Sequence, residues 1–439
     1  MWLTSVITGV VVAAAAVLAA QAGLGGSPTV KSLPASAAPQ PVPPASPQTA
    51  TAAPESPTSR PTERAPAGRI SAAALQRRLN MLAPSGGNPS FQVLEAAVSQ
   101  PVLQADAMRA VVPASALKII TTLAALSALG PEHRFATRAT TPSRGVVVLV
   151  GGGDPYLNPE QLQRLAAQTA QALRTSRQTK IRLDWNTALF TGPEQNPEWL
   201  SLDRAAAGAT AALRIQRSGG TDAAARAAGE TFASALEREG ITATLGERTT
   251  ATGAQLATVT SLPLASMIKT ILTRSDNAAA EVLFRQVAIA AKQPGTITAA
   301  QRAVPAELAR IGLPTRALVI SDGSGLARSS RTTPALLASA IRLSLDPKQP
   351  RLAALAEALP RAGLDGTLKT RFSAADTAAA RNVVRAKTGT LRGVQALVGY
   401  TRTRSGTIAI FAFVITGAAR DRGETWLDRA AATITSCGC

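Results

Sequence analysis

The spacing of apolar residues along the chain predicts several helices. After a candidate N-cap, Ser71, leucines recur at positions 75, 79 and 82 and would share one helical face. Residues 115–129 are almost entirely apolar and are followed by Gly130, which predicts a central helix buried on every side. Further helical patterns cover residues 159–174, 264–273, 278–291 and 422–435.

Shorter apolar runs predict strands. Residues 394–401 and 407–416 flank the turn-like segment 402–406, which predicts an antiparallel hairpin. Residues 98–104 could form a strand, but Pro101 would confine it to a sheet edge. Other candidate strands cover residues 146–150, 180–184 and 382–386. The evidence for folding begins near residue 70.

The first 68 residues have a different character. Residues 2–22 carry no charged side chain, have an apolar centre and end in Ala20-Gln-Ala22, a small-x-small cleavage site. At about 20 residues the stretch could also span a bilayer if it is retained. Residues 23–68 are rich in Pro, Ala and Ser, which predicts a disordered linker. We expect a signal peptide or membrane anchor at 1–22, and therefore a location outside the cytoplasm.

The charge of the chain narrows its partners. The formal net charge of +19 could suit nucleic acid, but aromatic residues make up only 3% and leave little for stacking on bases. The basic residues are also scattered, so nucleic acid is not expected. An anionic cell wall or membrane surface as the partner and a generally Arg-rich surface explain the charge equally well.

Histidine and cysteine are too scarce for most hydrolytic sites. The single histidine, His133, lies in a turn-like stretch and is expected at the surface. Zinc hydrolases usually need two or three imidazoles, so no metal is expected. Cys437 and Cys439 lie at the C-terminus, where their spacing suggests a loose end more than a framework disulfide. Lysine remains as the candidate base for a catalytic serine.

Lys118 is the exception in the apolar helix, because a buried lysine is costly unless something pairs with it or uses it. Ser115 lies three residues earlier on the same helical face, so its hydroxyl and the lysine amine can meet. In the first turn, the helix dipole and burial both favour a neutral amine. The pair predicts a serine nucleophile with a lysine base; a lysine reaching solvent from an ordinary helix end is the alternative.

Ser275-Asp276-Asn277 stands between two helical patterns. One interpretation is a helix N-cap, a position where all three residue types are common. In the functional interpretation, Ser275 passes a proton between Lys118 and a leaving amine, and Asn277 donates to the carbonyl of a peptide substrate.

Lys387-Thr388-Gly389-Thr390 follows a candidate strand. A cation beside the hydroxyls of Thr388 and Thr390 is suited to binding a peptide's terminal carboxylate. Gly389 would let the substrate backbone approach closely. The backbone N–H groups of Ser115 and Thr390 would then form an oxyanion hole.

In this order the three motifs match the trio of penicillin-binding proteins and class A β-lactamases. Residues 70–439 resemble the low-molecular-mass class C penicillin-binding proteins, the D-alanyl-D-alanine carboxypeptidase/endopeptidase family. Further matching stretches are Gly151-Gly-Gly-Asp-Pro-Tyr-Leu157, Ser321-Asp-Gly-Ser-Gly-Leu326, Arg331-Thr-Thr-Pro334, Asp365-Gly-Thr-Leu368 and Leu397-Val-Gly-Tyr400. We interpret the Asp322–Gly325 loop as a mainly structural turn.

The resemblance implies an α+β, penicillin-binding/serine β-lactamase-like transpeptidase fold: an antiparallel sheet flanked by helices, an all-helical subdomain and an inserted α/β domain. We expect residues 69–140 and 250–439 to form the catalytic domain and 141–249 the insert. In this family an insert aspartate recognises the amino group of the stem-peptide side chain. Asp203, four residues after Trp199, is the match, and a plain surface aspartate is the alternative.

The resemblance also implies the reaction. Ser115, activated by Lys118, would attack the penultimate D-Ala carbonyl of a peptidoglycan stem peptide, and water would resolve the acyl-enzyme. Where the leaving amine belongs to a cross-linked neighbouring stem peptide, the same reaction is endopeptidase activity. β-Lactams would be covalent inhibitors, and no cofactor is implied. The alternatives are a β-lactamase or esterase of the same fold and a catalytically weak wall-binding scaffold.

One absence separates these enzyme types. Class A β-lactamases activate the deacylating water with a glutamate that is shortly followed by an asparagine. Residues 278–381 contain no asparagine. We therefore expect a β-lactam acyl-enzyme on Ser115 to be long-lived.

Overall fold

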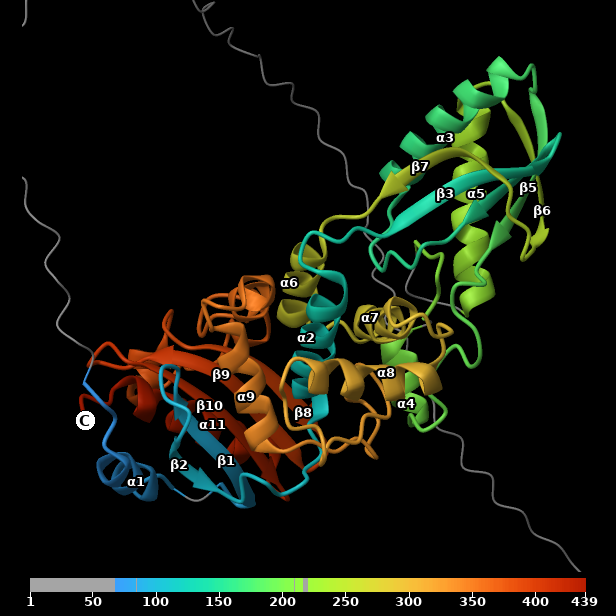
Figure 1. The fold of residues 1–439 in the computed structure, drawn as a ribbon. Helices are drawn as coiled ribbons and strands as arrows, with labels where there is room; N and C mark the ends of the chain where they lie inside the picture. The colour runs from blue at the N-terminus through green and yellow to red at the C-terminus, as the bar shows by residue number, and fades with distance from the viewer. Residues whose placement is uncertain (1–67, 84, 209, 216–219) are drawn as a thin grey trace, which may run out of the picture. The chain divides into compact units, whose positions relative to one another are not determined.

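The computed structural model describes residues 68–83, 85–208, 210–215 and 220–439, which contain two five-stranded sheets (Figure 1). The expected signal segment 1–22 and nearly all of the expected linker lie outside the described residues. Within the described part of the chain, every helix is too short or too polar to cross a bilayer.

The first sheet is antiparallel and has the order β2-β1-β10-β9-β8. Its strands are β1 (Asn88–Glu95), β2 (Pro101–Ala105), β8 (Arg385–Leu391), β9 (Val394–Arg402) and β10 (Ile408–Thr416). β10 runs through the centre, and its alternating side chains enter two different cores. Phe411 and Phe413 face α1 (Ala72–Asn80) and α11 (Arg420–Thr435), whereas Ile410 and Ala412 face the larger helical layer.

The helical layer surrounds α2 (Leu117–Leu129), which the single 3-10 turn Ala114–Ala116 precedes. The helices of this layer are α6 (Leu264–Arg274), α7 (Asn277–Ala290), α8 (Ile297–Arg310), α9 (Pro334–Ser344) and α10 (Ala353–Ala358). Short 3-10 helices cover Pro350–Leu352, Gly366–Leu368 and Ala375–Ala380. Because α2 lies inside this layer, it is buried along almost its whole length.

The second sheet has the order β6-β5-β4-β3-β7, with β4, β5 and β6 parallel and β3 antiparallel to its neighbours. Its strands are β3 (Ala136–Ser143), β4 (Val146–Val150), β5 (Lys180–Asn186), β6 (Thr242–Arg248) and β7 (Ala254–Thr260). α3 (Pro159–Thr175) and α5 (Thr221–Arg238) share its core, and α4 (Ser201–Ala207) is a short separate helix.

The boundaries expected from the sequence do not follow this sheet. The expected boundary at 140/141 falls inside β3, and the one at 249/250 assigns β7 to the catalytic domain. Both strands pair within the second sheet. We propose that the inserted domain extends from about residue 135 to about residue 261.

The predicted helices and strands are present, but the structure adds elements that were not predicted, among them β3, β6, β7, α5, α8, α9 and α10. Three further features differ from expectation. The strand expected at 382–386 begins only at Arg385, because Asn382 has a positive φ of 62° and turns the chain. β1 was not anticipated; it lies beside β2, which occupies the sheet edge that Pro101 requires. Cys437 and Cys439 are not loose but bonded to each other, and with a single residue between them they tie no distant segments together.

Gly399 fixes the approach of β8 to β9. It pairs with Ala386, and a Cβ at this position would lie 2.0 Å from the carbonyl oxygen of Arg385. We expect Gly399→Ala to displace β8 and to lower the free energy of unfolding by about 3 kcal/mol, measured by urea denaturation. Gly68→Ala is the control, since its Cβ would meet only Ser405 at 3.9 Å. Equal stability of the two variants would contradict this account of the sheet.

Candidate active site

Ser115 lies in the 3-10 turn before α2, and two glycines let other elements pack against that turn. Ala114 has a positive φ of 48°, a conformation that residues with a Cβ seldom adopt. A Cβ on Gly325 would lie 2.0 Å from the Ala114 carbonyl oxygen, and one on Gly389 would lie 2.8 Å from that of Pro113. Gly389 therefore admits the serine's own turn, and its predicted role in the close approach of substrate stays a prediction.

Lys118 is fully buried, and its Nζ has three partners. The distances are 3.1 Å to Ser115 Oγ, 2.7 Å to Asn277 Oδ1 and 2.7 Å to the Ser324 carbonyl oxygen. Carbonyl oxygens only accept hydrogen bonds. A neutral Lys118 would donate its two hydrogens to Asn277 and Ser324, so its lone pair would face the Ser115 hydroxyl. The arrangement is that of a base beside a nucleophile.

The environment of Lys118 makes this neutral form accessible. Burial lowers the pKa of its amine to about 8, against the opposing effects of Asp322, Glu281 and Asp276, in that order. Each of the three carboxyl groups favours the ammonium form, so together they limit how far burial lowers the pKa of the amine. The amine can therefore change protonation state near neutral pH, as a general base must.

The loop that holds Lys118 is organised by Asp322. This fully buried carboxylate accepts hydrogen bonds from three backbone amides, two hydroxyls and one indole. The donors are Gly325 N, Leu326 N, Ala327 N, Ser324 Oγ and Trp199 Nε1, at distances of 2.8–3.0 Å, and Ser330 Oγ at 3.3 Å. We interpreted this loop as mainly structural, but it also presents the Ser324 carbonyl to the base.

Glu281 was missed by the sequence analysis. It lies on α7, is buried, and accepts from the backbone amides of Gly323 at 2.9 Å and Ser324 at 2.7 Å. A signal was present, because Glu281 is a carboxylate in a mostly apolar helix, four residues after Asn277.

The three residues of the Ser275–Asn277 motif have different positions and contacts. Ser275 ends α6 in the left-handed conformation, with φ 54°. Asp276 is the N-cap of α7 and accepts from Ala279 N at 3.1 Å, and Tyr156 donates to it at 3.3 Å. The capping interpretation thus applies to Asp276. Ser275 lines a cavity and Asn277 binds Lys118.

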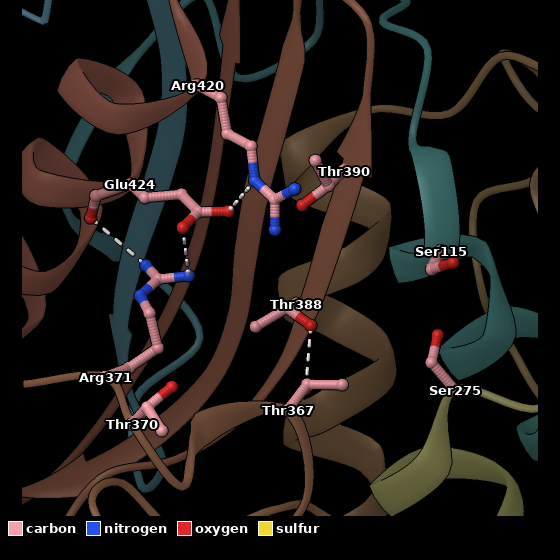
Figure 2. Close-up of a pocket in the computed structure, with 9 residues that line it drawn as sticks. All are labelled: Ser115, Ser275, Thr367, Thr370, Arg371, Thr388, Thr390, Arg420 and Glu424. Atoms are coloured by element: carbon pink, nitrogen blue, oxygen red, sulfur yellow. Dashed lines mark hydrogen bonds and ion pairs between the residues drawn. The ribbon is translucent and has the colours of Figure 1, made fainter. Parts of the chain in front are cut away.

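The cavity has a volume of about 280 Å³ and holds Ser115 and Ser275 on one side of β8 (Figure 2). Its lining residues are Ser115, Ser275, Thr367, Thr370, Arg371, Thr388, Thr390, Arg420 and Glu424. Side chains alternate along a strand, so Thr388 and Thr390 line the cavity while Lys387 does not. Lys387 is fully buried and donates to the Thr388 carbonyl at 2.8 Å. Burial, and then Lys118, hold the pKa of the Lys387 amine well below its usual range.

Two arginines line the other end of the cavity, and one of them, Arg420, is exposed. Arg371 forms ion pairs with Asp428, at 2.7 Å, and with Glu424. Arg420 donates to Glu424 through Nε at 3.0 Å, and its guanidinium reaches toward Thr390 (Figure 2). Within the described residues, its terminal nitrogens have no hydrogen-bond partner. This end can therefore receive an anion.

The remaining candidates lie elsewhere. Asp203 is partly exposed on α4 and does not line this cavity. His133 does not line it either; it packs edge-on against Phe135, and burial lowers its pKa. Across the described ranges, no cluster of three or more His, Cys, Asp or Glu residues could hold a metal ion.

Comparisons with known proteins identify the family. The profile of the D-Ala-D-Ala carboxypeptidase 3 (S13) family matches residues 72–214 and 207–435. Carboxypeptidase DacB of Mycolicibacterium smegmatis is 32% identical over 347 residues, covering 73% of this chain and 74% of that protein. A D-alanyl-D-alanine carboxypeptidase of Actinomadura sp. is 28% identical over 411 residues, covering 72% of this chain and 76% of that protein.

The fold agrees with this family. The crystal structure of penicillin-binding protein 4 from Haemophilus influenzae has a TM-score of 0.69 to this chain at 22% identity, covering 82% of this chain and 98% of the other. The α+β transpeptidase fold expected from the motifs is confirmed. The chain belongs to the D-Ala-D-Ala carboxypeptidase 3 (S13) family and is a low-molecular-mass class C penicillin-binding protein.

Proposed function

We propose that this serine DD-peptidase uses Ser115 as the acylated nucleophile and Lys118 as its base. The observation that carries the assignment is the set of contacts around Lys118 Nζ. Two partners can only accept, so the third, Ser115 Oγ, is the one that can give up a proton. The family membership supplies the substrate class, a peptide ending in D-Ala-D-Ala or cross-linked through a D-centre.

The proposed reaction begins when Lys118 takes the Ser115 proton and Ser115 Oγ attacks the penultimate D-Ala carbonyl. Backbone N–H groups of Ser115 and Thr390 stabilise the oxyanion. Lys118 then returns its proton through the Ser275 hydroxyl to the leaving nitrogen as the peptide C–N bond breaks. Water attacks the resulting ester and releases the shortened stem peptide.

The carboxylate on the leaving residue would bind along β8. The hydroxyls of Thr388 and Thr390 line the cavity, and the free edge of Arg420 supplies the positive charge. Lys387 lies on the inner side of the strand, so its proposed role is to hold the Thr388 carbonyl and thereby the position of β8.

Recognition of the stem-peptide side chain by Asp203 stays a prediction. Its support is the place of the segment that carries it. Trp199 and Ala207 flank Asp203 and share a small core with Leu326 and Ala327, and Leu391 at the end of β8 packs against that core. Asp203 is therefore attached to the elements that border the site.

Peptidoglycan is the substrate of this family and lies outside the cytoplasmic membrane, so the protein works in the cell envelope. Export or anchoring through residues 1–22 stays a proposal, as does an anionic wall or membrane surface as the partner of the basic chain. β-Lactams are the expected covalent inhibitors, and the related penicillin-binding protein 4 of Haemophilus influenzae has been solved with a β-lactam.

Ser115→Ala removes the nucleophile and should reduce D-Ala release from a synthetic pentapeptide by roughly 10⁴-fold or more. Labelling by fluorescent penicillin should vanish together with it. Ser266→Ala is the matched control, because Ser266 is exposed on α6 and away from the cavity. Undiminished labelling of Ser115→Ala would show that another residue is acylated.

The pKa of Lys118, lowered to about 8, predicts a pH dependence. Only the neutral amine can accept the Ser115 proton, so the acylation rate constant with penicillin should rise about tenfold per pH unit below pH 8 and level off above it. His133→Asn should show the same profile. A midpoint well below 8 that disappears in His133→Asn would instead make the histidine the base.

The penicilloyl-enzyme should be long-lived. Among the described residues, Glu424 is the one carboxylate that lines the cavity with Ser115, and its oxygens are engaged in ion pairs with Arg371 and Arg420 instead of facing a water beside the ester. Intact-mass spectra should therefore show the adduct persisting for many minutes after excess penicillin is removed. Turnover within seconds would favour the β-lactamase alternative.

A further inference from the structure

α7 carries a polar stripe through an apolar environment. Asn277, Glu281 and Arg285 are spaced four residues apart and so share one helical face. Asn277 binds Lys118, Glu281 binds the loop at 323–324, and Arg285 binds the carbonyl oxygens of Pro193 and, at 3.1 Å, Thr191. Glu281 is the acidic residue of the three. Its charge acts on Lys118, although the two side chains form no hydrogen bond.

Glu281 binds Ser324, the residue whose carbonyl oxygen accepts a hydrogen bond from Lys118. Its Oε1 accepts from both the Gly323 and the Ser324 amide, and the carbonyl oxygen of the same Ser324 accepts from Lys118 Nζ at 2.7 Å. Ser324 is thus fixed on its N–H side by Glu281 and on its C=O side by Lys118. A shift of the carboxylate would move the Ser324 carbonyl and release one of the three contacts that orient the amine.

The charged groups around Glu281 and Lys118 affect one another's pKa values. Asp322, Glu281 and Asp276 raise the pKa of Lys118, and Lys118 lowers that of Lys387. Burial, followed by Asp322, raises the pKa of Glu281 to about 7, while its hydrogen bonds from Ser324 and Gly323 oppose the rise. Arg285, on the next turn of α7, also interacts with Glu281. With a pKa of about 7 for Glu281 and about 8 for Lys118, Glu281 is charged where the amine loses its proton and becomes neutral as the pH falls below 7.

We propose that Glu281 is a positioning residue for the base: its carboxylate fixes the Ser324 carbonyl against Lys118, and its negative charge sets the pH at which the amine becomes competent. The proposal rests on the assignment of Lys118 as the base of Ser115. A purely structural role, in which Glu281 only satisfies two loop amides, makes a different prediction for the pH profile.

Glu281→Gln separates the two roles, because glutamine keeps an oxygen that can accept both amides but removes the charge. Loss of a nearby negative charge disfavours the ammonium form of Lys118. Above about pH 7, where wild-type Glu281 is charged, the midpoint of the acid limb of the penicillin acylation rate should therefore lie about 1 unit lower in the variant. Glu307→Gln is the matched control: Glu307 is also hydrogen-bonded, to Ser127 and Arg310, but lies on α8 outside the cavity.

Glu281→Asp supplies the complementary test. It keeps the charge but shortens the side chain, so the Ser324 carbonyl is held less firmly. Acylation should slow by about tenfold at every pH, with the acid limb near its wild-type position. Circular dichroism melting curves establish that each variant is folded.

The proposal is overturned if folded Glu281→Gln shows the wild-type acid limb, or if Glu281→Asp shifts the limb as the neutral variant is expected to. Failure of the proposed function is a separate outcome. In that case the wild-type protein would carry no penicilloyl adduct on Ser115 by peptide mass mapping, whatever residue stands at position 281.

Discussion

The structure depends on how one buried amine is accommodated. An isolated ammonium in an apolar interior is too costly to persist, so Lys118 must be neutral, paired, or able to change between the two. Its three hydrogen-bond partners come from the serine turn, from α7 and from the loop at 322–327. Placing the amine therefore requires segments far apart in the chain to meet at one point.

The same constraint explains why buried charges gather behind the site. Asp322 organises its loop through backbone amides, and Trp199 of the inserted domain donates to it at 2.9 Å. Arg285 on α7 binds carbonyl oxygens of the segment that begins at Thr191. The inserted domain is thus joined to two of the three elements that hold Lys118, the 322–327 loop and α7. Its packing and the competence of the base are physically connected.

Sequence patterns predicted the parts of the fold that depend on local signals. The apolar helix at 115–129, the hairpin strands and the edge strand with Pro101 all follow from periodicity and turn residues. The pairing of Ser115 with Lys118 followed from helical spacing. The motif order placed Ser275 and Asn277 at the same site as Lys118, but the direct contact of Asn277 with Lys118, across 159 positions of sequence, was not anticipated.

What the sequence did not reveal depends on tertiary contact. Glu281 and Asp322 look like ordinary acidic residues until the loop amides and the Trp199 indole are seen to surround them. Gly389 was assigned to substrate because nothing local indicates that the serine turn packs against it. The inner position of Lys387 follows from strand alternation, but only once the register of β8 against β9 is known.

The most direct test of the central claim is a crystal structure of the protein after reaction with penicillin. The account predicts a covalent bond from Ser115 Oγ to the opened β-lactam carbonyl, with the carbonyl oxygen between the N–H groups of Ser115 and Thr390. Lys118 Nζ should remain within hydrogen-bond distance of Ser115 Oγ. An adduct on another side chain, or a Lys118 amine turned away from the acylated serine, would contradict it.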